Sequence, residues 1–282
     1  GSLAGQTTQG TRATAVGNGA GNSSQGIQSV AVGNSAGQTT QGDNAVAVGP
    51  QAGNSSQGIQ SVAVGVNAGQ TTQGDFSVAV GRVAGQTTQG ENSVAIGNQA
   101  GNDTQGELSI AIGSQAGNDT QGLRAVAVGS GAGLTSQGER GIGIGSGAGA
   151  TSQGIQSVAI GQSAGTTTQG TYAISMGTNS GNAAQGAQSV AIGRSAGGTS
   201  QGTNSVALGF RAGETSQGGT SVAVGYLAGQ TNQHANSIVI SAAGVTAASN
   251  AVGDIYFTST GGFMRMAGAT GNWTSSGTTG NV

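Results

Sequence analysis

Side chains that could carry out catalysis are few in this sequence, and they form no recognisable site. The chain holds one His, His234, and no Cys. A lone His is more often a surface or capping residue than a general base. Ser and Thr are plentiful, but no Gly-x-Ser-x-Gly segment is paired with a plausible His and acid. We therefore expect no enzymatic activity, no catalytic residue and no cofactor.

The carboxylates stand at a regular spacing that could attract a cation. Asp75, Glu91 and Glu107 follow one another at intervals of sixteen residues, as do Asp103 and Asp119. If chain segments stack at that interval, like charges about 5 Å apart repel unless they are solvated or countered. Calcium-binding β-rolls need Asp in each turn, which this sequence lacks. We interpret the columns as a solvated outer corner with Glu–Arg pairing between coils, and we expect no metal site.

Hydroxyl groups recur at the same interval. Pairs such as Thr39-Thr40 and Thr71-Thr72 would form rows of hydroxyls on a stacked structure. Regular, flat Thr arrays organise water against ice in several β-solenoid antifreeze proteins, so an ice-binding protein is one alternative. The array is interrupted at Asp103, Asp119, Ala183 and Ala184.

Behind these spacings is one repeat of sixteen residues. The pair Gln-Gly recurs from Gln9 to Gln217 without insertion or deletion, and Gln233 keeps the register. One copy, residues 29–44, opens with Ser-Val-Ala-Val-Gly, whose β-branched alternation predicts a short strand. The Gly residues that follow mark turns, and sixteen residues are too few for a pair of helices. The period predicts an all-β fold, a parallel β-solenoid or β-roll with one coil per repeat over residues 1–240.

Two columns of the repeat are aliphatic and predict the core. Identical positions of stacked coils lie about 4.8 Å apart, so the two Val positions of each strand form continuous apolar rows. We expect both rows to face the coil interior. The predicted structural core includes Val30, Val32, Val62, Val64, Val94, Ile96, Val158 and Ile160.

Between these rows lies a column of small residues. Persistent Ala where an exposed strand would accept Thr, Lys or Glu implies that another backbone approaches closely. A coil with about two aliphatic side chains has a thin core, and packing several Ala faces around a threefold axis would supply further apolar burial. We therefore expect a homotrimer. The predicted trimer face includes Ala31, Ala63, Ala95, Ala127, Ala159 and Ala191.

The strongest polar constraint is the Gln of the repeat, which never varies from Gln9 to Gln233. A buried Gln must satisfy its amide, and identical amides at strand spacing can hydrogen-bond along the stack as a ladder. We interpret the column as structural. The predicted Gln ladder includes Gln25, Gln41, Gln57, Gln73, Gln89 and Gln105.

The period ends after Ile240, and residues 241–282 have a different composition. Two extended runs on either side of residues 259–262 predict a β-hairpin, and solenoids need atypical ends that protect the last coil from edge pairing. We expect a small C-terminal β cap, with a receptor-binding tip as the alternative. The segment resembles the short Gly-Asp-Ile-Tyr-Phe to Trp pattern near the ends of phage and viral fibre proteins. Its apolar residues are Tyr256, Phe257, Phe263, Met264, Met266 and Trp273.

The repeat also carries a family resemblance. Ser-Val-Ala-Ile-Gly at 93–97 and 157–161, with the Ala-Gly that follows, resembles the head repeat of YadA-like trimeric autotransporter adhesins, and similar repeats occur in fibre proteins of phages and large viruses. The resemblance implies a left-handed β-roll homotrimer that binds host or matrix surfaces. The family's usual repeat is shorter than sixteen residues, and the last 42 residues show neither a heptad stalk nor membrane anchor strands.

Composition narrows the remaining function classes. The net charge is −2, all seven basic residues are Arg, and hydrophobic residues make up 34%. This leaves no basic surface for nucleic acid, and no apolar run is long enough for membrane insertion. We expect an extracellular structural or adhesive fibre on a virion or cell surface, whose partners are its own copies and a host-surface glycan or protein. A self-assembling extracellular filament subunit is a further alternative.

Overall fold

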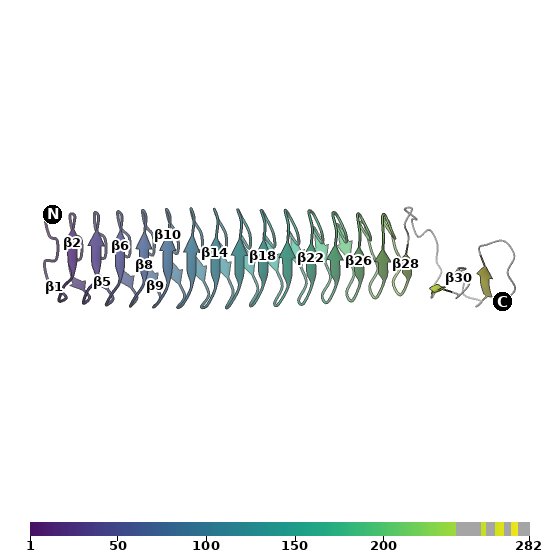
Figure 1. The fold of residues 1–282 in the computed structure, drawn as a ribbon, viewed down its shortest axis with the longest axis horizontal. Coiled ribbons are helices and arrows are strands. Elements are labelled where there is room, and N and C mark those ends of the chain that lie inside the picture. The colour runs from purple at the N-terminus through teal and green to yellow at the C-terminus, as the bar shows by residue number, and fades with distance from the viewer. Residues whose placement is uncertain (241–254, 258–262, 268–271, 276–282) are drawn as a thin grey trace. The chain divides into compact units, whose positions relative to one another are not determined.

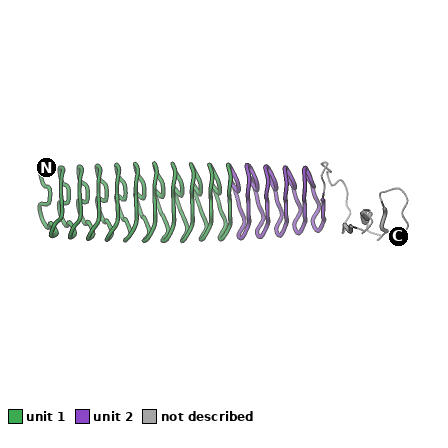
Figure 2. Tube along the Cα trace, in the orientation of Figure 1, with its two compact units in different colours: residues 1–162 green, residues 163–282 purple. Residues whose placement is uncertain are grey.

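The computed structural model describes residues 1–240, 255–257, 263–267 and 272–275. The chain is an all-β parallel β-solenoid of about 15 turns, with coils of about 16 residues. It divides into two compact units, residues 1–162 and 163–282 (Figure 2). In the described part of the chain, no helix is long and apolar enough to cross a membrane.

In the first unit each coil contributes a two-residue strand and a three-residue strand, and the two kinds stack separately as parallel sheets (Figure 1). The two-residue strands are β1 (Thr8–Gln9), β3 (Ser24–Gln25), β5 (Thr40–Gln41), β7 (Ser56–Gln57), β9 (Thr72–Gln73), β11 (Thr88–Gln89), β13 (Thr104–Gln105), β15 (Thr120–Gln121), β17 (Ser136–Gln137) and β19 (Ser152–Gln153). The three-residue strands are β2 (Thr14–Val16), β4 (Val30–Val32), β6 (Val46–Val48), β8 (Val62–Val64), β10 (Val78–Val80), β12 (Val94–Ile96), β14 (Ile110–Ile112), β16 (Val126–Val128), β18 (Ile142–Ile144) and β20 (Val158–Ile160).

The second unit is built from coils of the same kind. Its two-residue strands are β21 (Thr168–Gln169), β23 (Ala184–Gln185) and β25 (Ser200–Gln201). Its three-residue strands are β22 (Ile174–Met176), β24 (Val190–Ile192), β26 (Val206–Leu208), β27 (Val222–Val224) and β28 (Ile238–Ile240).

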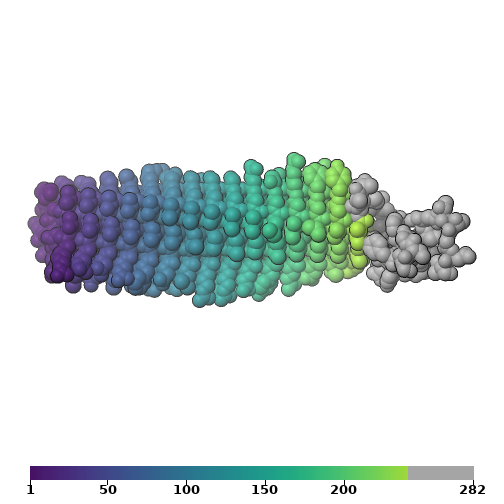
Figure 3. Space-filling view, in the orientation of Figure 1, coloured from purple at the N-terminus to yellow at the C-terminus, as the bar shows by residue number. Residues whose placement is uncertain are grey.

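The register places identical repeat positions side by side. Val30 pairs with Val46 and Ala31 with Ala47, and Gln41 of β5 pairs with Gln57 of β7. The interval between partners is the sixteen-residue period, so the predicted parallel β-solenoid is confirmed. Because every coil repeats its neighbour, residues at the same repeat position line up along each unit. The space-filling view shows the regular rows of atoms that result (Figure 3).

Glycine and left-handed residues make the corners of the coil. Ala45 donates its N–H to the carbonyl of Gly42 at 3.3 Å, and Asn44 between them has φ 58°. A Cβ on Gly42 would lie 2.6 Å from the carbonyl carbon of Gly58 in the next coil. The corner therefore requires Gly where two backbones meet and a residue that tolerates positive φ two positions later.

The coil interior is filled by the small and amide residues, which overturns the predicted core. Ala31 and Ser29 are fully buried and Gln41 is 2% exposed, whereas Val30 and Val32 on either side of Ala31 are only half-buried. The predicted core residues that instead face outward are Val30, Val32, Val62, Val64, Val94, Ile96, Val158 and Ile160, and Ile96 is 38% exposed.

The predicted trimer face is wrong for the same reason. Ala31, Ala63, Ala95, Ala127, Ala159 and Ala191 are all fully buried within a single chain, so none is available to a neighbouring protomer. A Cβ added to Gly69 would lie 2.7 Å from Oε1 of Gln73 and 3.4 Å from Cβ of Ala63. The Gln amide, the Gly backbone and the Ala methyl thus meet inside the coil and leave no room for Val.

The C-terminal segment contains three antiparallel strands, β29 (Ile255–Phe257), β30 (Phe263–Ala267) and β31 (Asn272–Ser275). Tyr256 pairs with Met264 in a register that agrees with the predicted hairpin, and β31 adds a strand that the sequence did not suggest. Residues 241–254 lie outside the described residues, so the division into 1–240 and 241–282 and the cap remain predictions.

Candidate functional site

The buried Gln of each coil ties the two sheets together. Nε2 of Gln41 donates to the carbonyl of Val30 at 2.8 Å, across the coil interior, and to the carbonyl of Ala45 at 3.4 Å, at the start of the next coil. The same pair of bonds recurs at Gln57 and Gln73. This Gln is therefore a structural crosslink, and it is not accessible to a ligand.

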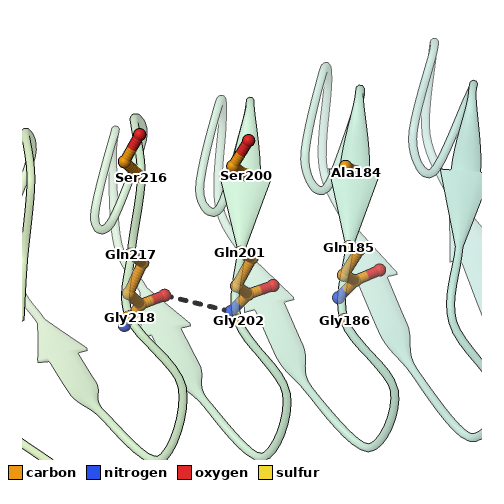
Figure 4. A pocket seen from close by; sticks show the side chains of 9 residues that line it. All are labelled: Ala184, Gln185, Gly186, Ser200, Gln201, Gly202, Ser216, Gln217 and Gly218. Atoms are coloured by element: carbon orange, nitrogen blue, oxygen red, sulfur yellow. Dashed lines mark hydrogen bonds between the residues drawn. The ribbon is translucent and has the colours of Figure 1, made fainter. Parts of the chain in front are cut away.

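Direct amide-to-amide bonds form in only part of the predicted ladder. In the first unit, Gln121 donates to Gln137 at 3.1 Å and Gln137 to Gln153 at 3.0 Å. In the second unit, Gln201 donates to Gln217 at 3.2 Å (Figure 4). Gln25, Gln41, Gln57, Gln73, Gln89 and Gln105 are buried as predicted and donate to backbone carbonyls, and Oε1 of the first five accepts no hydrogen bond.

Sequence reasoning missed the partner of this Gln. A Gly stands four residues before it in each repeat, as Gly37 does before Gln41. Gly37 has φ 51°, and a Cβ there would lie 2.9 Å from Cδ of Gln41. The signal was available, because this Gly is as constant as the Gln that packs on it.

The outward side chains of the three-residue strands form one continuous apolar surface in each unit, which we call the apolar face. Its two rows are the Val and Ile positions that flank the buried Ala. Each side chain of these rows is half-buried or exposed. The exposed members include Ile96, Ile112, Ile144, Met176 and Leu208. Contiguous exposed apolar surface of this kind marks an interaction site.

The outward side chains of the two-residue strands form a second surface, the hydroxyl face. Thr40, Thr72 and Thr88 are exposed there, and the residues that precede them, Thr39, Thr71 and Thr87, are exposed as well. In the second unit a hollow lies beside three successive coils, at Ala184, Ser200 and Ser216 (Figure 4). The residues that line this hollow are Ala184, Gln185, Gly186, Ser200, Gln201, Gly202, Ser216, Gln217 and Gly218.

The charged columns do not pair as predicted. The ion pairs among the described residues lie within a coil, between Arg140 and Glu139 at 3.3 Å and between Arg211 and Glu214 at 2.7 Å. Asp43 instead accepts a hydrogen bond from the backbone N–H of Ile27 at 2.7 Å, one coil away. The predicted pairing between coils is wrong: Asp43 and Asp75 accept from the backbone of the neighbouring coil, and Glu139 of the same column pairs with the adjacent Arg140. Over residues 1–240 and the three C-terminal strands, no group of three His, Cys, Asp or Glu residues could hold a metal.

The predicted cap or tip residues all lie on the C-terminal strands. Tyr256 and Phe257 are in β29, Phe263, Met264 and Met266 in β30, and Trp273 in β31. Their backbones form one antiparallel sheet, and their role as cap or tip remains a prediction.

Comparison with known proteins identifies the repeat. The family described as "YadA head domain repeat (2 copies)" matches residues 24–52, 56–84, 87–100, 152–180 and 184–212. The chain therefore carries YadA-like head repeats in both compact units, as its sequence suggested. Searches of curated proteins and of solved structures returned no match.

Proposed function

We propose that this chain is a segment of an extracellular homotrimeric adhesive fibre whose protomers pack through the apolar face. The YadA head repeats imply a trimeric adhesin-type fibre segment, and that repeat belongs to a structural, surface-exposed adhesin family rather than to an enzyme family. The half-exposed aliphatic rows carry the proposal, because they are the surface that a trimer would bury.

The energetics favour self-association through this face. The coil interior holds Ala, Ser, Gly and Gln, so most of the large aliphatic side chains stay outside. Each square ångström of apolar surface removed from water contributes roughly 25 cal/mol, and a row repeated in every coil sums this contribution along the stack. A second copy offers the same sixteen-residue spacing, so its rows match these coil by coil.

The adhesive role and the setting extend this proposal. A fibre built this way holds a receptor-binding surface away from the particle or cell that carries it, and the partner is a host-surface glycan or protein. We place the fibre on a virion because of the C-terminal pattern, with a cell-surface adhesin as the other setting. No observation favours the ice-binding or filament alternatives, since the hydroxyl face is exposed but interrupted at Asp103, Asp119, Ala183 and Ala184.

Light scattering on matched variants tests the trimer. Ile96→Asp places a charge on the apolar face, in β12, whereas Thr88→Asp places one on the hydroxyl face, in the preceding strand β11. We expect the wild-type chain and Thr88→Asp to have the mass of three chains and Ile96→Asp to have a lower mass with unchanged circular dichroism. A wild-type monomer, or equal masses for both variants, contradicts the proposal.

A further inference from the structure

One corner of the second unit carries an unusual cluster of aromatic and Arg side chains. Arg194, Phe210 and Tyr226 occupy the same repeat position on three consecutive coils, two residues after strands β24, β26 and β27. The rings of Phe210 and Tyr226 stack with centroids 5.4 Å apart and planes 10° from parallel. The Arg194 guanidinium carbon lies 5.6 Å from the centroid of the Phe210 ring. We call these three residues the aromatic corner.

The cluster is held in place by the backbone beneath it. Arg211 donates its N–H to the carbonyl of Arg194, and Leu227 to that of Phe210, both at 2.9 Å. These bonds fix the spacing of the three side chains at one coil each. Tyr226 is 52% exposed, so the stack is presented to solvent on a prepared scaffold.

The charge at the corner is positive although the chain is acidic. Arg211 gives its Nε to Glu214 at 2.7 Å, and Gln230 donates to the same carboxylate oxygen at 2.9 Å. This hydrogen bond raises the pKa of Arg211 above its ordinary value, so its charge is permanent and balanced by Glu214. Arg194 has no ion-pair partner among the described residues. One guanidinium is therefore uncompensated beside the half-buried ring of Phe210 and the exposed ring of Tyr226.

We propose that the aromatic corner binds an acidic oligosaccharide. A guanidinium matches the geometry of a carboxylate or sulfate group with two parallel hydrogen bonds. Aromatic side chains offer apolar surface to the C–H groups of a sugar ring, and the Tyr hydroxyl offers a polar end. The corner thus supplies both kinds of contact that a charged sugar needs.

The shape of the corner favours a sugar chain over a protein. A stable protein partner requires an interface of about 1,000 Å² or more, whereas the aromatic corner offers only one side chain per coil. Its turn backbones are bonded to neighbouring coils, so it has no free strand edge to add a peptide strand. A linear acidic sugar chain that lies along the aromatic corner contacts one side chain in each coil.

This inference rests on the proposed adhesive function and names a ligand class for it. The corner lies within one chain and does not need a trimer. Binding by a monomeric protein would therefore overturn the trimer and leave the aromatic corner intact.

Calorimetric titration of the full chain with an oligogalacturonate hexamer tests the inference. We expect Arg194→Gln and Tyr226→Ser each to weaken binding by at least about tenfold, the loss expected for one charge-assisted contact. The matched controls are Arg82→Gln, at the same repeat position but followed by Asn98 one coil later, and Tyr172→Ser, an exposed Tyr at another corner. Both controls should bind as the wild type does.

Three further probes separate the chemical contributions. A sulfated hexamer should bind through the same residues, whereas a neutral glucose hexamer should bind at least about tenfold more weakly. Equal binding of the neutral hexamer, of a polyglutamate peptide, or of Arg194→Gln overturns the proposal. So does the absence of any binding at millimolar hexamer, with circular dichroism verifying that every variant is folded.

Discussion

At the scale of single residues, the coil interior depends on a match between Gln and Gly. Gln137 shows the full set of contacts, donating to the carbonyls of Val126 and Gly141 and to Oε1 of Gln153. Gly133 lies against its amide, and a Cβ there would be 2.8 Å from Oε1. The Gln amide therefore fills the space that a Cβ would occupy, and the position opposite it must be Gly.

Replacing this amide by a hydrocarbon of similar size should destabilise the chain. Gln137→Leu removes the side-chain donor from the carbonyls of Val126 and Gly141, of which Gly141 keeps a bond from the backbone N–H of Val126. The loss should cost about 0.5–1.5 kcal/mol per hydrogen bond. We expect a lower midpoint of thermal unfolding by circular dichroism. Gln162→Leu, at an exposed position, is the control and should melt as the wild type does. Equal melting of both variants would disprove the crosslink.

Substitutions at two glycines of one coil distinguish the cost of left-handed backbone strain from the cost of a steric clash. Gly131 has φ 64° with nothing near its Cβ position, whereas Gly133 has φ 53° and faces Gln137. Gly131→Ala should cost about 1–2 kcal/mol for the left-handed backbone alone. Gly133→Ala adds overpacking of about 1–3 kcal/mol and should melt at a clearly lower temperature. The reverse order would refute the Gly–Gln contact.

At the scale of the strand, neighbouring residues have opposite roles. In β14, Ala111 is fully buried while Ile110 is half-buried and Ile112 is 38% exposed. Alternation places Ile110 and Ile112 on one face, but it does not say which face is inside. The width of the coil decides this, since Gln and Gly from the opposite side leave space only for a methyl group.

This assignment predicts different effects for two adjacent substitutions. Ala111→Val forces two methyl groups into a closed interior and should lower stability by about 1–3 kcal/mol. Ile112→Val removes one methylene from an outward side chain and should cost less than about 1 kcal/mol in the isolated chain. Thermal melting under conditions that hold both variants monomeric measures the difference. If Ile112→Val proved the more damaging change, the interior would be wrongly assigned.

At the scale of the whole molecule, stability is a sum over coils that contact their neighbours. Strands pair at the sixteen-residue interval throughout each unit, as Val94 does with Ile110. Such an array tolerates loss of a whole repeat far better than loss of part of one. The apolar face and the aromatic corner both depend on this sixteen-residue register, because each of their rows takes one residue from every coil.

Deleting residues 93–108 removes one repeat of the first unit and should leave circular dichroism per residue unchanged. The coils on either side then meet in register, so the melting temperature should fall only slightly. Deleting residues 93–100, half a repeat, brings residues of different columns into register and should cause local unfolding, detected by proteolysis. Equal protease resistance of the two deletion variants would show that the fold does not depend on the sixteen-residue register between coils.

The period alone established the parallel solenoid, the one-coil repeat and the column in which each residue stands, because stacking at sixteen residues is a property of the chain order. It also carried the YadA-like repeat and the constant Gln. Which columns face the interior and which face outward was decided only by the folded coil. Val30 and Ala31 alternate identically whether the coil interior is wide or narrow, and only the Gln41 amide reaching the carbonyl of Val30 across that interior makes it narrow. The aromatic corner likewise emerged in three dimensions, since Arg194, Phe210 and Tyr226 are sixteen residues apart in sequence and become neighbours only when their coils stack.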